Sequence, residues 1–406
     1  MRVLLSAYAF EPNSGSESGV GWNWATRLAA HHEVVVLTRA TNRAKIESVA
    51  AELPEGLSFA YVHDRYREPW HWPLGLGWLA YYHWQVVGGQ TALALHRDQP
   101  FDLAHHVTFA SWRAPSFLYR LGIPFIWGPV GGGQSSPPGF LSILGFGGTV
   151  RELLRGVFQN LSRLDPFVRR TMNRATLVMA ANTATLNFLP RKLNARKRLL
   201  LETALDERQI GDRPHPRGSP GQLRVLWVGY LNPSKALPLL IEAVAQTPAS
   251  SGVEVEVVGG GPEEVRWMDL VHRHSVEDRI TFLGPRRYEE VQHLYGVADA
   301  LVFTSLRETS GNVLLEAMAA GLPVVCLDWS GPADLTVPDV ALRIPAEKPA
   351  QVVRDLSSAL QRLSGDVEFR AQLGAAGQDH VVRHHTWTKR LSAMLRYYEE
   401  AVGDSD

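Results

Sequence analysis

The chain has 406 residues, and its 41 lysines and arginines are balanced by 41 aspartates and glutamates. This length exceeds one ordinary hydrophobic core, so we expect two domains, and the charge balance gives no argument for a nucleic-acid partner. The single cysteine, Cys326, excludes a disulfide framework and fits a reducing compartment.

The first half of the chain predicts alternating strands and helices. Short apolar runs indicate buried strands, and apolar residues three or four positions apart indicate helices. The expected strands cover residues 2–8, 33–38, 57–62, 102–107, 124–127, 176–180 and 198–201. The expected helices cover residues 21–30, 44–51, 73–96, 114–121, 149–174 with a break at Asp165-Pro166, and 184–189. This alternation predicts a parallel sheet that is covered on both faces.

A polar segment rich in Pro and Gly, residues 206–221, predicts a linker. The alternation restarts after it, with strands at 224–228, 253–258, 280–283, 300–304 and 324–327 and helices at 237–245, 263–274, 288–295, 313–321 and 388–402. We therefore expect two doubly wound α/β domains, 1–205 and 222–384, with a C-terminal helix, 385–406, packing back on the first. Ligands of such sheets bind at the carboxyl ends of the strands, which predicts an active site in a cleft between facing domains.

The N-terminal apolar run, residues 1–10, is short and lacks a cleavage signature, which favours a first strand over a signal peptide. The chain has no stretch of about 18 uninterrupted apolar residues, which is the pattern that predicts a membrane-spanning helix. We therefore expect a cytoplasmic protein. A peripheral membrane surface remains open, because aromatic and basic residues gather in the first domain. The alternative is an aromatic core helix with a solvated charge patch. The residues concerned are Trp70, Trp72, Trp78, Tyr81, Tyr82, Trp84, Arg191, Lys192, Arg196, Lys197 and Arg198.

Residues 305–328, SLRETSGNVLLEAMAAGLPVVCLD, predict an anion site. An apolar strand leads into a Gly-bearing polar loop, and a helix starts near Val313. The N–H groups at such a helix start bind phosphate. Glu308 in the loop and Glu316 in the helix lie eight positions apart. Their carboxylates could accept hydrogen bonds from hydroxyl groups on either side of a diphosphate, which is the layout of a sugar nucleotide.

The segment ETSGNVLLEAMAAGLPVV, residues 308–325, resembles the signature of family 4 retaining glycosyltransferases, which have the GT-B fold. The resemblance extends to SAYAFEPNSGSESGVGWNWA, residues 6–25, and to the C-terminal helix, and so covers nearly the whole chain. It implies transfer of a hexose from a UDP- or GDP-linked sugar to a glycan or lipid-linked acceptor, as in polysaccharide biosynthesis. It also implies retention of anomeric configuration, with neither a bound metal nor a separate cofactor.

The resemblance implies a role for each matching residue. Glu308 would bind hydroxyl groups of the donor sugar, Glu316 would bind the ribose hydroxyls, and Lys235 would bind the diphosphate. The backbone N–H groups of Val313 and Leu314 would hold the diphosphate at the helix start. Further donor contacts are implied for Gly15, Gly19, Leu283, Gly284, Ser310, Gly311 and Asn312.

Two positions depart from the family pattern after the strand at 224–228. Tyr230 stands where an arginine is expected, and Ala236 stands where a glycine follows the lysine. One of two charges that would stabilise the leaving diphosphate is therefore missing. Arg307 or Arg286 could supply it.

His105 and His106 end a predicted strand of the first domain. Adjacent strand residues point to opposite faces, so only one can face the cleft. The resemblance implies a histidine near the donor sugar, and we assign His106 as catalytic, with a satisfied core histidine as the alternative. The loop 128–133 ends the next strand and is expected on the acceptor side.

Other functions remain open at this point. A phosphorylase or a nucleotide-sugar epimerase could share the fold, but the sequence shows no clear cofactor lysine or second phosphate site. A non-enzymatic, two-lobed sugar-binding protein would normally be exported. The one D-x-D motif lies at residues 404–406, and no His/Cys group has zinc spacing.

Overall fold

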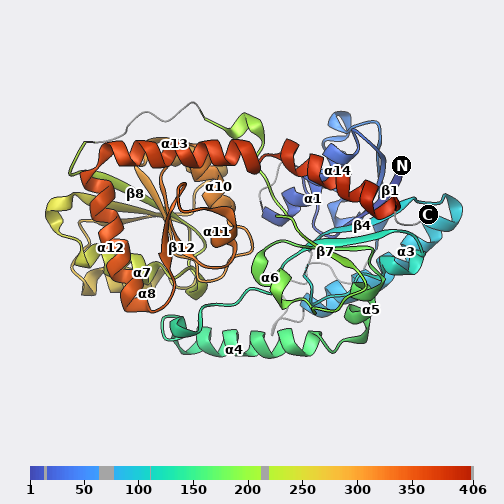
Figure 1. Ribbon diagram of the computed structural model, residues 1–406, viewed down its shortest axis with the longest axis horizontal. Coiled ribbons are helices and arrows are strands. Elements are labelled where there is room, and N and C mark those ends of the chain that lie inside the picture. Colours follow the sequence, from blue (N-terminus) through green and yellow to red (C-terminus); the bar gives the residue numbers. More distant parts are fainter. Residues whose placement is uncertain (13–15, 64–76, 110, 212–218, 404–406) are drawn as a thin grey trace. The chain divides into compact units, whose positions relative to one another are not determined.

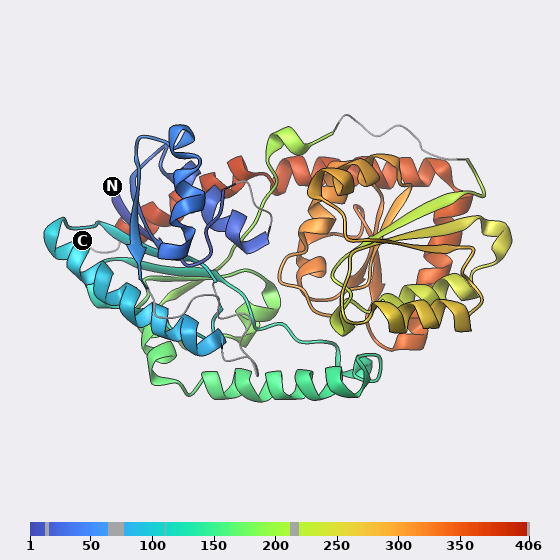
Figure 2. The same ribbon diagram turned by 180° about the vertical axis from the view of Figure 1, so that it is seen from behind.

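The computed structural model describes residues 1–12, 16–63, 77–109, 111–211 and 219–403. They form two compact units, each with strands at its centre and helices around them (Figures 1 and 2). Unit 1 contains residues 1–133, 157–203 and 390–406, and unit 2 contains residues 134–156 and 204–389.

Unit 1 has a seven-stranded parallel sheet in the order β3-β2-β1-β4-β5-β6-β7. Its strands are β1 (Arg2–Ala7), β2 (Glu33–Arg39), β3 (Leu57–Val62), β4 (Leu103–Thr108), β5 (Phe125–Val130), β6 (Leu177–Ala180) and β7 (Arg196–Leu199). Its helices are α1 (Ser16–Leu28), α2 (Arg43–Glu47), α3 (Gly77–Asp98), α5 (Pro166–Arg174), α6 (Thr183–Phe188) and α14 (Trp387–Gly403).

Unit 2 has a six-stranded parallel sheet in the order β10-β9-β8-β11-β12-β13. Its strands are β8 (Leu223–Val228), β9 (Val253–Val258), β10 (Ile280–Gly284), β11 (Ala300–Phe303), β12 (Val324–Asp328) and β13 (Leu342–Pro345). Its helices are α7 (Leu237–Gln246), α8 (Glu264–Arg273), α9 (Tyr288–Val297), α10 (Asn312–Ala319), α11 (Ser330–Leu335), α12 (Pro349–Gly365) and α13 (Val367–His384). The boundary between the units falls within α4 (Gly145–Ser162).

Short 3-10 turns complete the described structure. They are η1 (Ala40–Asn42), η2 (Ala50–Glu52), η5 (Phe117–Leu121), η6 (Pro138–Phe140), η7 (Glu207–Gln209), η8 (Pro233–Lys235) and η9 (Ala249–Ser251).

Each sheet confirms the predicted doubly wound α/β class, because its strand order reverses once. In unit 1 the reversal lies between β1 and β4, and in unit 2 it lies between β8 and β11. Loops at the carboxyl ends of the two strands beside a reversal separate and leave a crevice for a ligand. The topology thus directs attention to the residues that follow these four strands.

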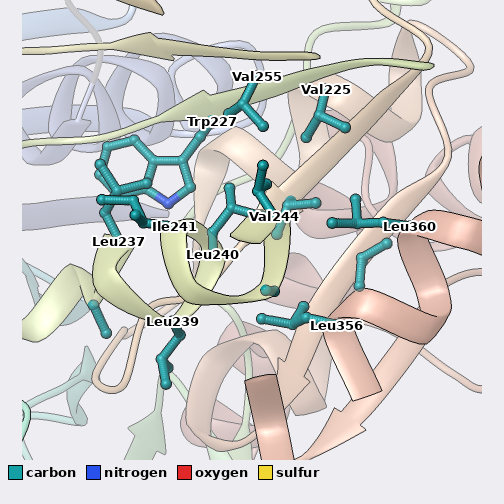
Figure 3. Close-up of a cluster of buried hydrophobic side chains, with 14 of the residues drawn as sticks. Val225, Trp227, Leu237, Leu239, Leu240, Ile241, Val244, Val255, Leu356 and Leu360 are labelled. Atoms are coloured by element: carbon teal, nitrogen blue, oxygen red, sulfur yellow. The ribbon is translucent and has the colours of Figure 1, made fainter. Parts of the chain in front are cut away.

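A packed core supports the inner strands of the unit 2 sheet (Figure 3). Residues of α7 at spacings of three and four, including Leu240 and Val244, lie against β8 and against Leu356 and Leu360 of α12. Each of these side chains is 1% exposed or less, and full burial of such a side chain stabilises the fold by roughly 1.5–3 kcal/mol. The loops after β8 and β11 therefore start from a rigid base.

Some predicted helices are displaced or shortened. The predicted helix 114–121 is only the 3-10 turn η5, because Pro115 disfavours helical geometry at the preceding residue. The predicted helix 44–51 is the short α2 followed by η2. The predicted break at Asp165-Pro166 is present, since the Asp165 carboxylate caps α5 by accepting from Phe167 N at 2.7 Å.

The segment 134–156 differs from its predicted place within a first domain of residues 1–205. It groups with unit 2 because Phe140 and Leu144 are buried in the unit 2 core. Of the predicted linker 206–221, residues 212–218 lie outside the described residues. Residues just before them pack on unit 2, where Gly211 accepts from Gln378 Nε2 at 3.0 Å. Residues from Arg390 onward group with unit 1.

The aromatic segment of the first half is largely core. Tyr81 and Trp84 of α3 are at most 2% exposed, whereas Trp78 is 46% exposed. Trp70 and Trp72 lie outside the described residues. Arg196 and Arg198 of β7 both pair with Glu400 of α14. Tyr81 and Trp84 agree with the aromatic-core alternative, and an interfacial surface in this region stays a prediction.

No helix in the described ranges has both the length and the apolar character needed to cross a bilayer. Cys326, in the middle of β12, is 1% exposed, as expected for a small core residue. Burial raises the pKa of its thiol to about 11.

Candidate functional site

The loops beside the strand reversal of unit 2 bring together two of the predicted catalytic residues. Lys235 ends the turn η8 after β8, and Glu308 lies in the loop after β11. The Lys235 ammonium forms an ion pair with Glu308 Oε2. Both side chains are about one-fifth exposed, at 20% and 22%. The pair therefore bridges the crevice that the topology predicts, and a ligand can still reach it.

A chain of hydrogen bonds fixes the pair to the sheet. The indole of Trp227 donates to Thr304 Oγ1 at 3.0 Å, and Thr304 Oγ1 donates to the Lys235 carbonyl oxygen at 2.7 Å. The hydroxyl of Ser305 donates to Glu308 Oε2 at 3.3 Å. Because Trp227 is buried at the end of β8, the backbone that carries Lys235 is held by the core.

Ala236, directly after Lys235, adopts a left-handed conformation with φ of 47°. This is the position where the family pattern has glycine, and the conformation explains that preference. A residue with a Cβ is strained there by roughly 1–2 kcal/mol. The turn that presents Lys235 is thus kept despite the substitution.

The loop after β11 leads into α10 as predicted. Gly311, the residue before the helix, has φ of 95°, which favours glycine. Ser310 and Gly311 are buried, and Asn312 is partly buried. A side chain at Gly331 would collide with the carbonyl oxygen of Thr309, so the α11 start holds this loop closely.

One predicted diphosphate donor is already in use at the start of α10. The Leu314 N–H donates to the Gly311 carbonyl oxygen at 2.9 Å. The amide of Leu314 would have to exchange this partner to bind a phosphate. Val313, one position earlier, lies in the first turn, where the helix dipole is most positive.

Glu316 lies among tyrosines on the other side of α10. Tyr295 of α9 donates its hydroxyl to Glu316 Oε2 at 3.0 Å. Burial raises the pKa of Glu316 from 4.5 to about 7, and the bond from Tyr295 opposes this shift. Burial, and then the charge of Glu316, raises the pKa of Tyr288 to about 12. Glu316 thus changes its charge near neutral pH.

Arg307 is not free to supply the positive charge that is missing at Tyr230. Arg307 pairs with Glu152 of α4, whose other oxygen accepts from Ser136 N at 2.8 Å. Arg286 is exposed, and Tyr230 is 61% exposed. In the free protein both cations next to the crevice, Lys235 and Arg307, are therefore neutralised by carboxylates.

Leu283 and Gly284 end β10, at the same edge of the sheet but two strands away from β8. The Gly284 carbonyl oxygen accepts from Gly259 N at 3.0 Å. A Cβ added at Gly284 would meet nothing within 4 Å, so the space beside this strand end is open. This leaves room for a flat ligand group beside these two implied donor contacts.

Neither histidine is exposed to solvent, so the burial favours the core-histidine alternative, and a catalytic role for His106 stays a prediction. Both histidines at the end of β4 are buried, His105 at 0% and His106 at 1% exposure. Burial lowers the pKa of His105 to about 4 and that of His106 to about 3, so both are neutral at physiological pH. β4 is the central strand of unit 1, and both of its faces are covered.

The two histidines differ in their hydrogen bonds. His105 Nε2 donates to the Gly128 carbonyl oxygen at 2.6 Å, so its Nδ1 accepts from the Tyr398 hydroxyl at 2.7 Å. His105 is a satisfied core histidine. His106 Nε2 lies 3.3 Å from the Tyr81 hydroxyl, which donates to the Phe109 carbonyl oxygen. Within the described chain, His106 Nδ1 has no hydrogen-bond partner.

Gly15 and Gly19, two of the implied donor contacts, precede the helix that was expected at residues 21–30. α1 begins at Ser16, so Gly19 is a buried residue of the first helical turns and does not lie in a loop. Gly15 lies outside the described residues. A donor-binding role for either glycine stays a prediction.

Sequence reasoning missed the residues that surround the two glutamates. Tyr288 and Tyr295 are seven positions apart on α9, a spacing that places them on one helix face, and this signal was available. Gln134, whose Nε2 donates to Thr309 Oγ1 at 2.7 Å, and Glu152 come from a segment far away in the sequence. No local pattern points to them.

Metal ligands do not gather anywhere in the described ranges. These ranges contain no cluster of three or more His, Cys, Asp or Glu residues that could hold an ion.

Comparison with known proteins shows what the second half of this chain is similar to. Residues 212–380 match the family model described as "Glycosyl transferases group 1". D-inositol 3-phosphate glycosyltransferase of Stackebrandtia nassauensis is 31% identical over 201 residues, which are 46% of this chain and 43% of that protein. The chain thus matches less than half the length of this curated relative.

Solved structures extend the likeness to both units. Sucrose-phosphate synthase of Thermosynechococcus elongatus has a TM-score of 0.69 at 18% identity, and the match covers 99% of each chain. HepE of Anabaena, solved in complex with UDP, has a TM-score of 0.65 at 17% identity and covers 98% of this chain and 100% of its own. The chain therefore has the GT-B fold, and its residues 212–380 are similar to the group 1 glycosyl transferases.

Proposed function

We propose that this chain is a retaining glycosyltransferase that moves a hexose from a nucleotide diphosphate sugar to a glycan or lipid-linked acceptor, without a metal ion. The ion pair between Lys235 and Glu308, at the strand reversal and beside the start of α10, carries the proposal. It supports the proposal because an ammonium that could bind phosphate contacts a carboxylate that could bind sugar hydroxyls.

Donor binding would exchange the partners of this pair. The diphosphate takes the Lys235 ammonium and the N–H groups at the start of α10, and Glu308 turns to hydroxyl groups of the hexose. Glu316 receives the two ribose hydroxyls. The open space beside Gly284 accepts the base. Each group of the donor then has a partner of matching chemistry on one edge of one sheet.

The proposed transfer proceeds on one face of the sugar. The acceptor oxygen forms a bond to the anomeric carbon as the bond from that carbon to the diphosphate oxygen breaks. The electron pair of the broken bond leaves with the diphosphate, and the acceptor proton passes to a phosphate oxygen. Lys235 and the dipole of α10 stabilise the growing negative charge on the leaving group. No carboxylate acts as a nucleophile in this scheme.

Titration of the purified protein with UDP, GDP and free hexoses tests the proposal. We expect saturable binding of one of the two nucleotides and nucleotide release from a matching sugar nucleotide. The Lys235→Ala variant should bind that nucleotide at least about 10-fold more weakly, since it lacks the cation for the diphosphate.

Two results would contradict this function. A protein that ignores both nucleotides but binds free hexose is a sugar-binding protein. A protein that releases no nucleotide but forms sugar phosphate from glycan and inorganic phosphate is a phosphorylase. The exposed Lys389→Ala variant, on α14, serves as a matched control for the loss of one lysine charge.

A further inference from the structure

Helix α4 and the residue two positions beyond it expose an apolar stripe. Its members recur at spacings of three and four, which places them on one face of the helix. Their exposed fractions run from 38% to 89%. The stripe consists of Phe146, Val150, Leu153, Leu154, Val157, Phe158, Leu161 and Leu164.

The opposite, polar face of α4 is the one that contacts the protein. Gln159 is 4% exposed and donates to the Gly132 carbonyl oxygen at 2.6 Å. Glu152 holds Arg307 and the Ser136 amide, and Arg155 donates to the Gln134 carbonyl oxygen at 2.7 Å. Surface helices normally bury their apolar face and expose their polar one. α4 is therefore inverted, and within the described part of the chain its outer face lacks an apolar covering.

The charges around the stripe have one sign. Residues 145–174 contain six arginines and two carboxylates, a net charge of +4 in a chain whose total is zero. Both carboxylates are used internally, Glu152 with Arg307 and Asp165 as the cap of α5. The exposed charged residues of this segment are Arg151, Arg169, Arg170 and Arg174.

This combination selects among the surfaces that could cover the stripe. A second copy of the chain would bring a segment of charge +4 against another of the same charge, which opposes pairing. A bilayer with anionic headgroups offers both an apolar interior for the leucines and phenylalanines and negative charge for the arginines. Apolar residues on one face with arginines beside them are typical of helices that lie in a membrane interface.

We propose that α4 docks this protein on anionic lipid bilayers, lying in the interface with Leu154 and Phe158 inserted and the arginines of α4 and α5 at the headgroups. The docking surface differs from the aromatic segment of α3, whose Tyr81 and Trp84 are core residues. It is argued separately from the proposed reaction, because no residue of the stripe is among those assigned to the donor. The contact between Glu152 and Arg307 nonetheless places the donor loop directly against the inner face of the docking helix.

Vesicle sedimentation tests the proposal with the whole 406-residue chain. We expect binding to phosphatidylcholine vesicles that contain about a third phosphatidylglycerol, weak binding to pure phosphatidylcholine, and weaker binding as salt is added. The double variant Leu154→Glu and Phe158→Glu should lose at least about 10-fold in partition to the anionic vesicles. Both positions are more than half exposed, at 53% and 60%, so folding should be retained.

A matched control lies on α8. Val265→Glu changes an apolar residue that is 81% exposed to the same charged residue, away from the stripe. This variant should bind vesicles as the unmodified protein does. Nucleotide titration of all variants separates the two proposals. If a variant loses vesicle binding but still binds nucleotide, its substitutions affect membrane docking and not the donor site.

Two outcomes overturn the inference. In the first, vesicle binding is absent, or is unchanged by the Leu154→Glu and Phe158→Glu substitutions. In the second, light scattering shows a dimer that these substitutions convert to a monomer, which would assign the stripe to a second copy of the chain.

Discussion

Replacing Glu308 with alanine is expected to lower turnover by more than about 10-fold, because the carboxylate would bind sugar hydroxyls in the transition state. The structure adds a second, opposite effect. In the free protein Glu308 neutralises Lys235, so its removal leaves the ammonium available to a diphosphate. Free UDP or GDP, which has no sugar, should then bind at least as tightly as before. Turnover and nucleotide affinity would move in opposite directions.

Steady-state kinetics and calorimetric titration check this pair of effects. The Glu308→Gln variant keeps a hydrogen-bonding oxygen but loses the charge, and should fall between the other two proteins in turnover. Glu254→Ala is the matched control, since Glu254 is an exposed glutamate of β9 in the same sheet. Near-normal turnover of Glu308→Ala would refute the assignment of this residue to the donor sugar.

For Glu316 we expect donor binding that strengthens as pH rises. Burial raises the pKa of this carboxyl to about 7 in the free protein. Two ribose hydroxyls would each donate to the ionised form, so binding the donor lowers the pKa. Affinity for a sugar nucleotide should therefore increase by about 10-fold or more between about pH 5.5 and about pH 8. Calorimetry with an intact sugar nucleotide measures this slope, because its diphosphate diester does not titrate in that range.

The Glu316→Gln variant supplies the control for this pH effect. Glutamine does not ionise, so the slope should disappear, and turnover should fall by more than about 10-fold from the lost acceptor. A slope that survives in Glu316→Gln would assign the titration to another group.

Stability should change with pH in the other direction. A carboxyl whose pKa is raised in the folded state stabilises the fold fully below about pH 4.5, and this contribution is lost as pH rises through about 7. The Glu316→Gln variant, which lacks this ionisable group, should therefore be more stable than the unmodified protein at about pH 8.

The strands were predictable because their signal is local. The run from Ala300 to Thr304 is apolar without interruption, as a strand buried on both faces must be. The start and end of α10 were predictable from Gly311 and Gly321. Both residues adopt left-handed conformations, which favour glycine. Glu308 and Glu316 could be selected for the same reason, since the loop and helix that carry them are contiguous in the chain.

The contacts of the site were not predictable, because they join distant segments. Lys235 and Glu308 are 73 positions apart in the sequence. Each was predicted to bind a part of the donor, so an ion pair between them was not expected. Glu152 neutralises Arg307 from a segment that was predicted to belong to the other domain. Free cations were therefore expected where the fold supplies compensated ones.

The histidines show why a correct rule about strand faces does not predict exposure. His105 and His106 do point to opposite faces of β4, as the pleat requires. However, β4 lies at the centre of a seven-stranded sheet, and all six of its residues are buried. Alternation separates an inner from an outer face only where one face meets solvent. The place of a strand within its sheet is not readable from the strand alone.

The burial of Cys326 has a practical consequence for chemistry at other positions. It is the only cysteine of the chain, it is 1% exposed, and its thiol has a pKa of about 11. Maleimides react with exposed thiolates, so the natural protein offers them no target near neutral pH. One cysteine introduced on the outer face of α4, such as Leu154→Cys, would accept a single fluorophore without any prior removal of native thiols. The emission of that dye would report whether its position enters a lipid layer. A series of such single-cysteine variants would show how deeply each position of the helix enters.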